Sequence, residues 1–233
     1  MISLPPSRFF PPAEYADAEG VVGFGGQLAS EWLLDAYQHG IFPWPTGDPG
    51  LPVPWCSPDP RAIFDLDHFH VPRRLARTCR SAKFRVTMDT DFSGVIQGCA
   101  TCGMRRGQTW LTPPMVRAYT QLFQEGHAHS VEVWRDDQLA GGTYGLAIGG
   151  LYAAESMFYR VRDASKVALV YLVARLRRRG YALIDIQQLT PHTAQFGAVE
   201  IPRAEYLRRL AEVIDLAVTF GDRGEETLQP AAP

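Results

Sequence analysis

The fold is decided by residues 128–187, which read AHSVEVWRDD QLAGGTYGLA IGGLYAAESM FYRVRDASKV ALVYLVARLR RRGYALIDIQ. Alternating apolar positions, apolar runs and short turns divide this stretch into strands, and a 3.6-residue apolar period predicts a helix over 164–179 that ends at Gly180. The predicted strands cover 128–135, 139–148, 151–158 and 181–187. Three strands follow one another as an antiparallel meander, and the fourth, reached through the helix, can lie parallel to its partner. The stretch therefore predicts an α+β domain around a mixed central sheet.

The rest of the chain adds helices around this sheet and an irregular region before it. A helix is expected over 30–39, with Ser30 as its N-cap and Gly40 at its C-terminal end. Other helices are expected over 72–79, 92–100, 113–125 and 203–217, and one further strand over 83–88. The first 62 residues are rich in Pro, Gly and aromatic side chains and close in a rigid two-proline turn, so we expect a domain boundary there. The expected parts are a small N-terminal domain over 1–62, a larger domain over 63–220 and a polar tail over 221–233.

The charge of the chain is unevenly distributed. Its 23 basic and 25 acidic residues give a net charge of −2, yet residues 71–117 hold nine basic against two acidic residues, and 160–180 hold seven against one. The two blocks include Arg73, Arg74, Arg77, Arg80, Lys83 and Arg85, and Arg175, Arg177, Arg178 and Arg179. Such an uneven distribution of charge suggests a phosphate-bearing partner docked on one face. The alternative is a pair of solvated helix surfaces that bind nothing.

Composition excludes several classes of protein. With 46% hydrophobic residues the chain can bury a core and is not intrinsically disordered. The longest apolar stretch in a helical pattern, 167–174, is far shorter than the roughly 20 residues that span a bilayer, so we expect no membrane segment. Four cysteines do not suffice for a secreted disulfide framework, so we expect a reducing cytoplasm.

A C-x-x-C motif at Cys99 and Cys102 is the one candidate for metal binding or thiol exchange. The histidines that could complete a zinc site are His68, His70, His127 and His129. They form H-x-H pairs, which is not an established zinc spacing. We therefore expect no metal.

Two acidic residues interrupt strands that are otherwise apolar. Glu155 lies in the third strand of the meander and Asp185 in the last predicted strand, where an unpaired charge would be costly. Gln187 follows Asp185 by two positions, so strand alternation places both side chains on one face. The acids either belong to a functional site or anchor the structure through ion pairs and hydrogen bonds. The glycines of the strand over 139–148 do not form a phosphate loop and indicate bulges or close packing.

Two of the five tryptophans are held by rigid turns. Trp55 precedes Ser57-Pro58, and Trp110 precedes Thr112-Pro113-Pro114. A rigidly held indole beside a basic surface suits stacking on a nucleobase. The alternative is that both indoles pack in the core.

Several short motifs follow one another along most of the chain. They are Gly40-Ile41-Phe42-Pro43-Trp44, Trp55-Cys56-Ser57-Pro58-Asp59-Pro60-Arg61, Thr109-Trp110, His127-Ala128-His129-Ser130-Val131-Glu132, Glu155-Ser156-Met157-Phe158, Ala164-Ser165-Lys166, Leu183-Ile184-Asp185 and Gly197-Ala198. In this order the chain resembles the bacterial leucyl/phenylalanyl-tRNA–protein transferases. Thr143 and Ala154 stand where the family commonly has a large apolar residue and Gly, which leaves the shape of the amino-acid pocket open.

The resemblance implies a cytoplasmic enzyme, expected as a monomer without a cofactor, that moves Leu or Phe, with Met as a further candidate, from aminoacyl-tRNA to proteins. The acceptor would be the α-amino group of an N-terminal Arg or Lys, and the product would enter protein degradation. The domain over 63–220 would be similar to the GCN5-related acetyltransferases. The residues carried over are Asp185 and Gln187 as a catalytic relay, Glu155 as a substrate-orienting carboxylate, Trp55 and Trp110 at the aminoacyl-adenosine site, and Met157 and Thr143 in the amino-acid pocket. The ten basic residues named above would contact phosphates of the acceptor stem.

The chemistry of this reaction suits those residues. An aminoacyl ester is already activated, so attack by an amine requires only a deprotonated nucleophile, a stabilised oxyanion and a protonated leaving hydroxyl. A carboxylate that polarises a glutamine amide, Asp185 through Gln187, can draw off the amine proton. Two alternatives stay open: an acyl-CoA-dependent acetyltransferase, whose expected pyrophosphate loop we do not find, and a non-catalytic tRNA-binding protein.

Overall fold

A central eight-stranded sheet organises the molecule. The structure is a computed structural model, and it describes residues 4–48, 50–102 and 110–225. The strand order is β10-β4-β9-β8-β7-β6-β5-β11. The strands are β4 Arg61–Phe64, β5 Arg85–Met88, β6 Ala128–Arg135, β7 Gln138–Ile148, β8 Leu151–Tyr159, β9 Leu183–Gln187, β10 Ala198–Ile201 and β11 Gly224–Glu225. All neighbours are antiparallel except β8 and β9, which pair in parallel across the α5 connection. The expected α+β fold with a mixed sheet is therefore confirmed.

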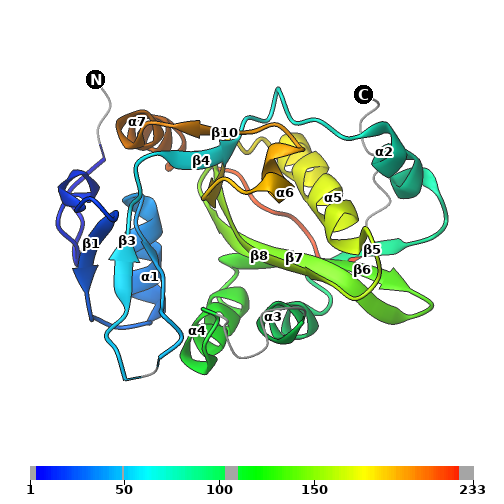
Figure 1. Cartoon of the computed structure of the whole chain (residues 1–233), viewed down its shortest axis with the longest axis horizontal. Helices are drawn as coiled ribbons and strands as arrows, with labels where there is room; N and C mark the ends of the chain where they lie inside the picture. The colour runs from blue at the N-terminus through cyan, green and yellow to red at the C-terminus, as the bar shows by residue number, and fades with distance from the viewer. Residues whose placement is uncertain (1–3, 49, 103–109, 226–233) are drawn as a thin grey trace.

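Helices cover both faces of this sheet (Figure 1). They are α1 Ser30–Gln38, α2 Arg73–Arg80, α3 Phe92–Thr101, α4 Pro113–Gln124, α5 Ala164–Arg179, α6 Pro191–Ala194 and α7 Arg203–Val213. The helix α5 lies on one face with α2 beside it, whereas α3 and α4 lie on the other face. The buried apolar side chains accordingly form two clusters, one around α5 and one around α3 and α4. In the described part of the chain, no helix has both the length and the apolar character needed to cross a bilayer.

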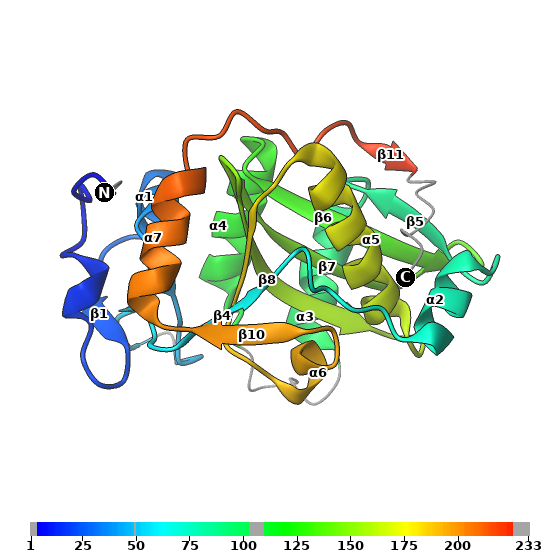
Figure 2. The same ribbon diagram turned by 90° about the horizontal axis from the view of Figure 1, so that it is seen from above.

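A second, three-stranded sheet lies at the N-terminal end of the molecule, next to α1 and α7 (Figure 2). Its strands are β1 Val21–Phe24, β2 Phe42–Pro43 and β3 Pro54–Cys56, and a 3-10 turn, Ala13–Tyr15, precedes them. Gly40 ends α1 with a φ of 75°, and a Cβ there would lie 2.5 Å from Leu207 of α7. Gly40 thus serves both the turn and the close approach of α7. The division at residue 62 stays a prediction, and β4 runs through that position.

The sequence located the longest elements best. The strand over 128–135 and the helix over 164–179 have these bounds in the structure, as β6 and α5. The last strand begins at Leu183 rather than 181, α7 ends at Val213 rather than 217, and the N-cap of α1 is Ala29 rather than Ser30. The sequence did not indicate β4 and β10, because each has only four residues and pairs with distant parts of the chain. Nor did it indicate β11, which pairs with β5 inside the region expected to be a polar tail.

Candidate active site

A cavity of about 430 Å³ lies beside the ends of β8 and β9. The parallel pairing of these strands stops at Ala153 and Asp185, so the rest of β8 is free to line the cavity. The apolar lining residues include Phe42, Trp44, Phe64, Trp110, Met157, Leu169 and Ile186, and the polar ones include Thr143, Glu155, Gln187, Gln188 and His192. A largely apolar cavity of this size with a few convergent polar groups is typical of a small-molecule site.

A β-bulge places Glu155 at this cavity. Tyr144 and Gly145 are adjacent on β7, but their partners on β8 are Ser156 and Ala154, so Glu155 is the extra residue of the bulge. A Cβ on Gly145 would lie 2.2 Å from a backbone oxygen of β8, which explains a glycine there. The bulge indicated by the glycines of this strand is therefore present.

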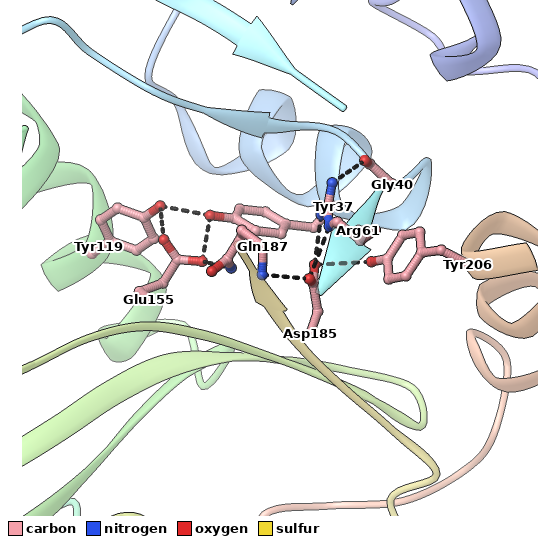
Figure 3. Close-up of polar contacts among 8 residues, drawn as sticks. All are labelled: Tyr37, Gly40, Arg61, Tyr119, Glu155, Asp185, Gln187 and Tyr206. Atoms are coloured by element: carbon pink, nitrogen blue, oxygen red, sulfur yellow. Dashed lines mark hydrogen bonds and ion pairs between the residues drawn. The ribbon is translucent and has the colours of Figure 1, made fainter. Parts of the chain in front are cut away.

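Glu155 is hydrogen-bonded to two tyrosines and a glutamine (Figure 3). The Tyr37 hydroxyl donates to Oε1 at 2.7 Å, and the Tyr119 hydroxyl donates to Oε2 at 3.0 Å. The two hydroxyl oxygens lie 2.7 Å apart, and Gln187 Nε2 donates to Oε1 at 3.2 Å. Because Tyr37 belongs to α1 and Tyr119 to α4, two helices that are distant in the sequence hold the carboxyl of Glu155.

Two features bear on the acidity of Glu155, namely its burial and the number of protons that its carboxyl shares with Tyr37 and Tyr119. The ring of Tyr37, Tyr119 and Glu155 has three oxygen–oxygen contacts, and two phenolic protons can fill only two of them. A protonated carboxyl supplies the third proton, whereas an ionised one leaves two oxygen lone pairs facing each other. Burial, the largest effect, raises the pKa of Glu155 to about 7, although hydrogen bonds from the tyrosines act to lower it. Glu155 therefore exchanges a proton near neutral pH.

This pKa makes the stability of the protein depend on pH through Glu155. A carboxyl whose folded pKa is raised above its unfolded value of about 4.3 contributes fully below that value and loses its contribution as the pH rises through the folded pKa, here near 7. An amide imitates the protonated carboxyl at every pH, so the stability of Glu155→Gln should not change through this group. As the pH rises from roughly 4.5 to 8, the free energy of unfolding of the variant should therefore increase by about 3 kcal/mol relative to that of wild type. Urea unfolding across this range measures the difference. Two parallel stability curves would contradict the assignment.

Asp185 belongs to a separate, fully buried cluster. Its carboxylate is 0% exposed and accepts from Arg61 Nε at 2.9 Å, from Arg61 Nη2 at 2.6 Å and from the Tyr206 hydroxyl at 2.9 Å. The guanidinium of Arg61 lies between the rings of Phe42 and Tyr206, 4.6 and 4.5 Å from their centroids, and donates to the Gly40 carbonyl at 3.1 Å. Both carboxylate oxygens are thus occupied by protein donors. Asp185 fits the structural alternative, an ion-pair anchor.

The geometry corrects the predicted contact between Asp185 and the amide of Gln187. Asp185 Oδ1 accepts from the backbone N–H of Gln187 at 2.9 Å, whereas the side-chain amide donates to Glu155. The φ of Gln187 is 58°, so the strand alternation that placed the two side chains together does not hold there. This backbone conformation is unfavourable for a residue other than Gly, and the hydrogen bond to Asp185 helps to hold it. Asp185 therefore positions Gln187 through the backbone.

The structure places the two predicted tryptophans differently, because Trp110 lines the cavity whereas Trp55 does not. Trp55 is 2% exposed, donates from Nε1 to the Gly25 carbonyl at 2.8 Å and packs in the N-terminal core. The indole that lies beside Trp110 is Trp44, with ring centroids 6.1 Å apart and an interplanar angle of 16°. Both rings line the cavity. Neighbouring prolines could not tell an indole at the cavity from a buried one, because Trp44 also has a proline on each side.

Met157 and Thr143 both line the cavity, as expected for the pocket. The Thr143 hydroxyl donates to the Ser156 carbonyl at 2.9 Å, so its polar group already has a partner. Their proposed contact with an amino-acid side chain is compatible with these positions. It stays a prediction.

The basic residues divide into exposed and buried groups. The exposed residues are Arg73, Arg74, Arg77, Arg80, Lys83, Arg85, Arg177 and Arg178, and Arg179 is half-buried. Arg175 is 5% exposed and donates to the carbonyls of Phe220 and Asp222 at 2.7 and 2.9 Å, so it holds the C-terminal segment. Its burial removes Arg175 from the predicted phosphate contacts. Arg105 and Arg106 of the first basic block lie outside the described residues.

The C-x-x-C motif shows no metal-site geometry. Cys99 is buried in the α3 core, Cys102 is partly buried, and neither forms a disulfide bond. Within residues 4–48, 50–102 and 110–225, no three side chains of His, Cys, Asp or Glu gather as a metal site would require. His129 instead lies 2.7 Å from the Asp89 carboxylate.

Sequence reasoning missed several residues that build the site. They are Tyr37, Trp44, Arg61, Tyr119 and Tyr206. Arg61 carried a signal, because it opens an apolar strand at the end of the Trp55–Arg61 motif. The tyrosines carried none, since they occupy ordinary apolar positions of their helices.

Comparison with known proteins supplies the class. A family model described as leucyl/phenylalanyl-tRNA protein transferase matches residues 63–211, and the model of that family's N-terminal domain matches residues 26–59. A relative named leucyl/phenylalanyl-tRNA–protein transferase from Thiobacillus denitrificans is 48% identical over 212 residues, 90% of this chain and 92% of the relative. One with the same name from Chromohalobacter salexigens is 47% identical over 233 residues, 99% of this chain and 88% of the relative. These similarities define an aminoacyltransferase.

More specifically, the chain belongs to the leucyl/phenylalanyl-tRNA protein transferase family. Among solved structures it is remotely similar to a GCN5-related N-acetyltransferase from Kribbella flavida, with 12% identity and a TM-score of 0.41 over 72% of this chain and 59% of that chain. It is also remotely similar to L-PGS from Bacillus licheniformis, with 11% identity and a TM-score of 0.40 over 65% of this chain and 48% of that chain.

Proposed function

We propose that the enzyme moves Leu or Phe from aminoacyl-tRNA to the α-amino group of proteins that begin with Arg or Lys. The product would enter protein degradation, and the enzyme would act in the cytoplasm as a monomer. Family membership supports the aminoacyl-tRNA donor and the protein acceptor. The observation that carries the chemistry is Glu155, a carboxyl with a pKa near 7 at a cavity that two indoles line.

Two groups of lining residues suit the two ends of the aminoacyl-adenosine donor. Aromatic side chains stack on nucleobases, and Trp44 and Trp110, which both line the cavity, are available for the terminal adenine of the tRNA. The apolar wall, with Met157, Leu169 and Ile186, suits the side chain of Leu or Phe. Exposed basic residues on and after α2 are available for the phosphates of the acceptor stem.

The transfer step requires one proton acceptor. The amine nitrogen of the acceptor protein attacks the ester carbonyl carbon, a C–N bond forms, and the bond from that carbon to the ribose oxygen breaks. Ionised Glu155 takes the proton that the amine loses and returns it to the leaving ribose oxygen, which departs as a hydroxyl, so charge and atoms balance and Glu155 is ionised again. Free α-amines have pKa values of about 7.7–8.0, so a base with a pKa near 7 is strong enough. Gln187, held by Asp185 and Glu155, orients the carboxyl.

A transfer assay tests this function. We expect radiolabelled Leu or Phe to move from charged tRNA to a peptide that begins with Arg or Lys, and not to the same peptide beginning with Ala. Acetyl-CoA as donor should give no product. Acetyl transfer would favour the acetyltransferase alternative, and tRNA binding without transfer from any charged tRNA would favour the non-catalytic one.

A further inference from the structure

A second, smaller cavity of about 150 Å³ lies where the first turns of α2 and α5 meet. Three basic side chains line it, Arg74 from α2, Arg162 from the β8–α5 connection and Lys166 from α5. Among its lining residues the acid is Asp163, whose carboxylate is 3.8 Å from Arg162 Nε. The cavity therefore has an excess of positive charge.

Neutral groups of the protein do little to compensate this charge. Lys166 is half-buried, and its Nζ is 3.4 Å from the amide oxygen of Gln195, which is a long contact to an uncharged partner. The start of α5 adds the positive end of a 16-residue helix, where the N-cap residue Asp163 is the acid and makes no side-chain capping hydrogen bond. With three basic side chains and one acid in the lining, the cavity attracts an anion.

The small cavity adjoins the candidate active site. Ser165 lines the larger cavity, and the next residue, Lys166, lines the smaller one. Gln195 of the smaller cavity donates to the carbonyl of His192, which lines the larger one, at 2.8 Å. On the opposite side, Arg74 belongs to the exposed basic face of α2, which lies beside α5 in Figure 1. The small cavity thus lies between the indole-lined site and this basic face.

We propose that Arg74, Arg162 and Lys166 form a subsite for a backbone phosphodiester of the single-stranded 3′ end of the aminoacyl-tRNA, an inference that rests on the proposed function. A nucleic-acid strand whose last base lies against Trp44 and Trp110 carries its next phosphates outside the larger cavity, and the small cavity supplies charge for one of them. Arg guanidinium and Lys ammonium groups are the usual partners of phosphate oxygens. Arg162 and Lys166 thereby join the nucleic-acid contacts, next to Arg74.

The test compares two donors that differ in their phosphates. Leucyl-tRNA carries the phosphodiester, whereas 3′-O-leucyl-adenosine carries none. With leucyl-tRNA, we expect Arg162→Met, Lys166→Met and the double variant to raise KM about tenfold or more, and to reduce the salt slope of tRNA binding by about one unit per charge removed. With leucyl-adenosine, the kinetics of the same variants should stay near those of wild type.

Arg8→Met is the matched control, because Arg8 is an exposed, ion-paired arginine of the N-terminal segment. It should change neither donor's kinetics. Equal losses with both donors would assign these side chains to the active site itself and overturn the phosphate subsite, as would an unchanged salt slope. The salt slope can be measured with uncharged tRNA, so this test of the phosphate subsite does not depend on transfer. If wild type transferred nothing from either donor, that result would refute the proposed function and not the subsite.

Discussion

Glu155→Gln is expected to lower the turnover of transfer from leucyl-tRNA by about 10²–10⁴-fold, the range typical of a lost general base. The amide keeps the size of the carboxyl and can still bond to Tyr37 and Tyr119, so the folded structure should persist. It cannot accept the amine proton. Single-turnover kinetics with saturating Arg-peptide measure the change, and KM for the tRNA should move little.

Glu132→Gln is a matched control for this variant. Glu132 is another buried carboxyl of the same sheet, hydrogen-bonded by Thr87, Thr90 and Ser130, and burial raises its pKa too. It does not line the cavity. We expect wild-type turnover from this control. A Glu155→Gln enzyme with full turnover would refute the base and leave Glu155 as a binding group.

Asp185→Ala is expected to lower the free energy of unfolding by about 3–5 kcal/mol, because it leaves the guanidinium of Arg61 buried without its counter-charge. Urea denaturation, with the midpoint and slope compared to wild type, measures this loss. A double variant tests whether the unpaired charge causes this loss. Arg61→Met combined with Asp185→Leu removes both charges and should recover much of the stability.

The same pair of variants separates anchoring from catalysis. If Asp185 anchors the structure and positions Gln187, the double variant should regain stability but not full turnover, because the N–H of Gln187 has lost its acceptor. An Asp185→Ala protein as stable as wild type would contradict the anchor. Full turnover in the stabilised double variant would contradict the positioning role.

Local patterns predicted most of the fold. The meander, α5 and the mixed sheet follow from periodicity and turn residues within 60 consecutive positions, where pairing partners are near in sequence. The short strands β4 and β10 owe their existence to partners more than 100 residues away, which no local pattern encodes. The bulge at Glu155 was indicated only as a possibility of the glycine-rich strand.

Part of the candidate site was predicted from the sequence. The two expectations that the structure corrects, the contact of Asp185 with the Gln187 amide and the place of Trp55, failed for a common reason. Glu155 was identified because a carboxyl in an apolar strand is costly, which is a property of the residue and its neighbours. The Asp185–Gln187 contact and the choice of Trp55 required knowing backbone conformation and burial. The left-handed φ of Gln187 and the burial of Trp55 arise from tertiary packing, so alternation and turn chemistry could not supply them.

The proton-exchanging carboxyl is completed by a helix from the other end of the chain. Tyr37 of α1 bonds to Glu155, and the turn after α1 gives its Gly40 carbonyl to Arg61, which in turn holds Asp185. Neither the first 62 residues nor the rest therefore contains a complete site. Activity therefore depends on complete assembly: a newly made chain in which α1 has not yet docked can carry a finished sheet, yet its Glu155 lacks the hydrogen bond from Tyr37.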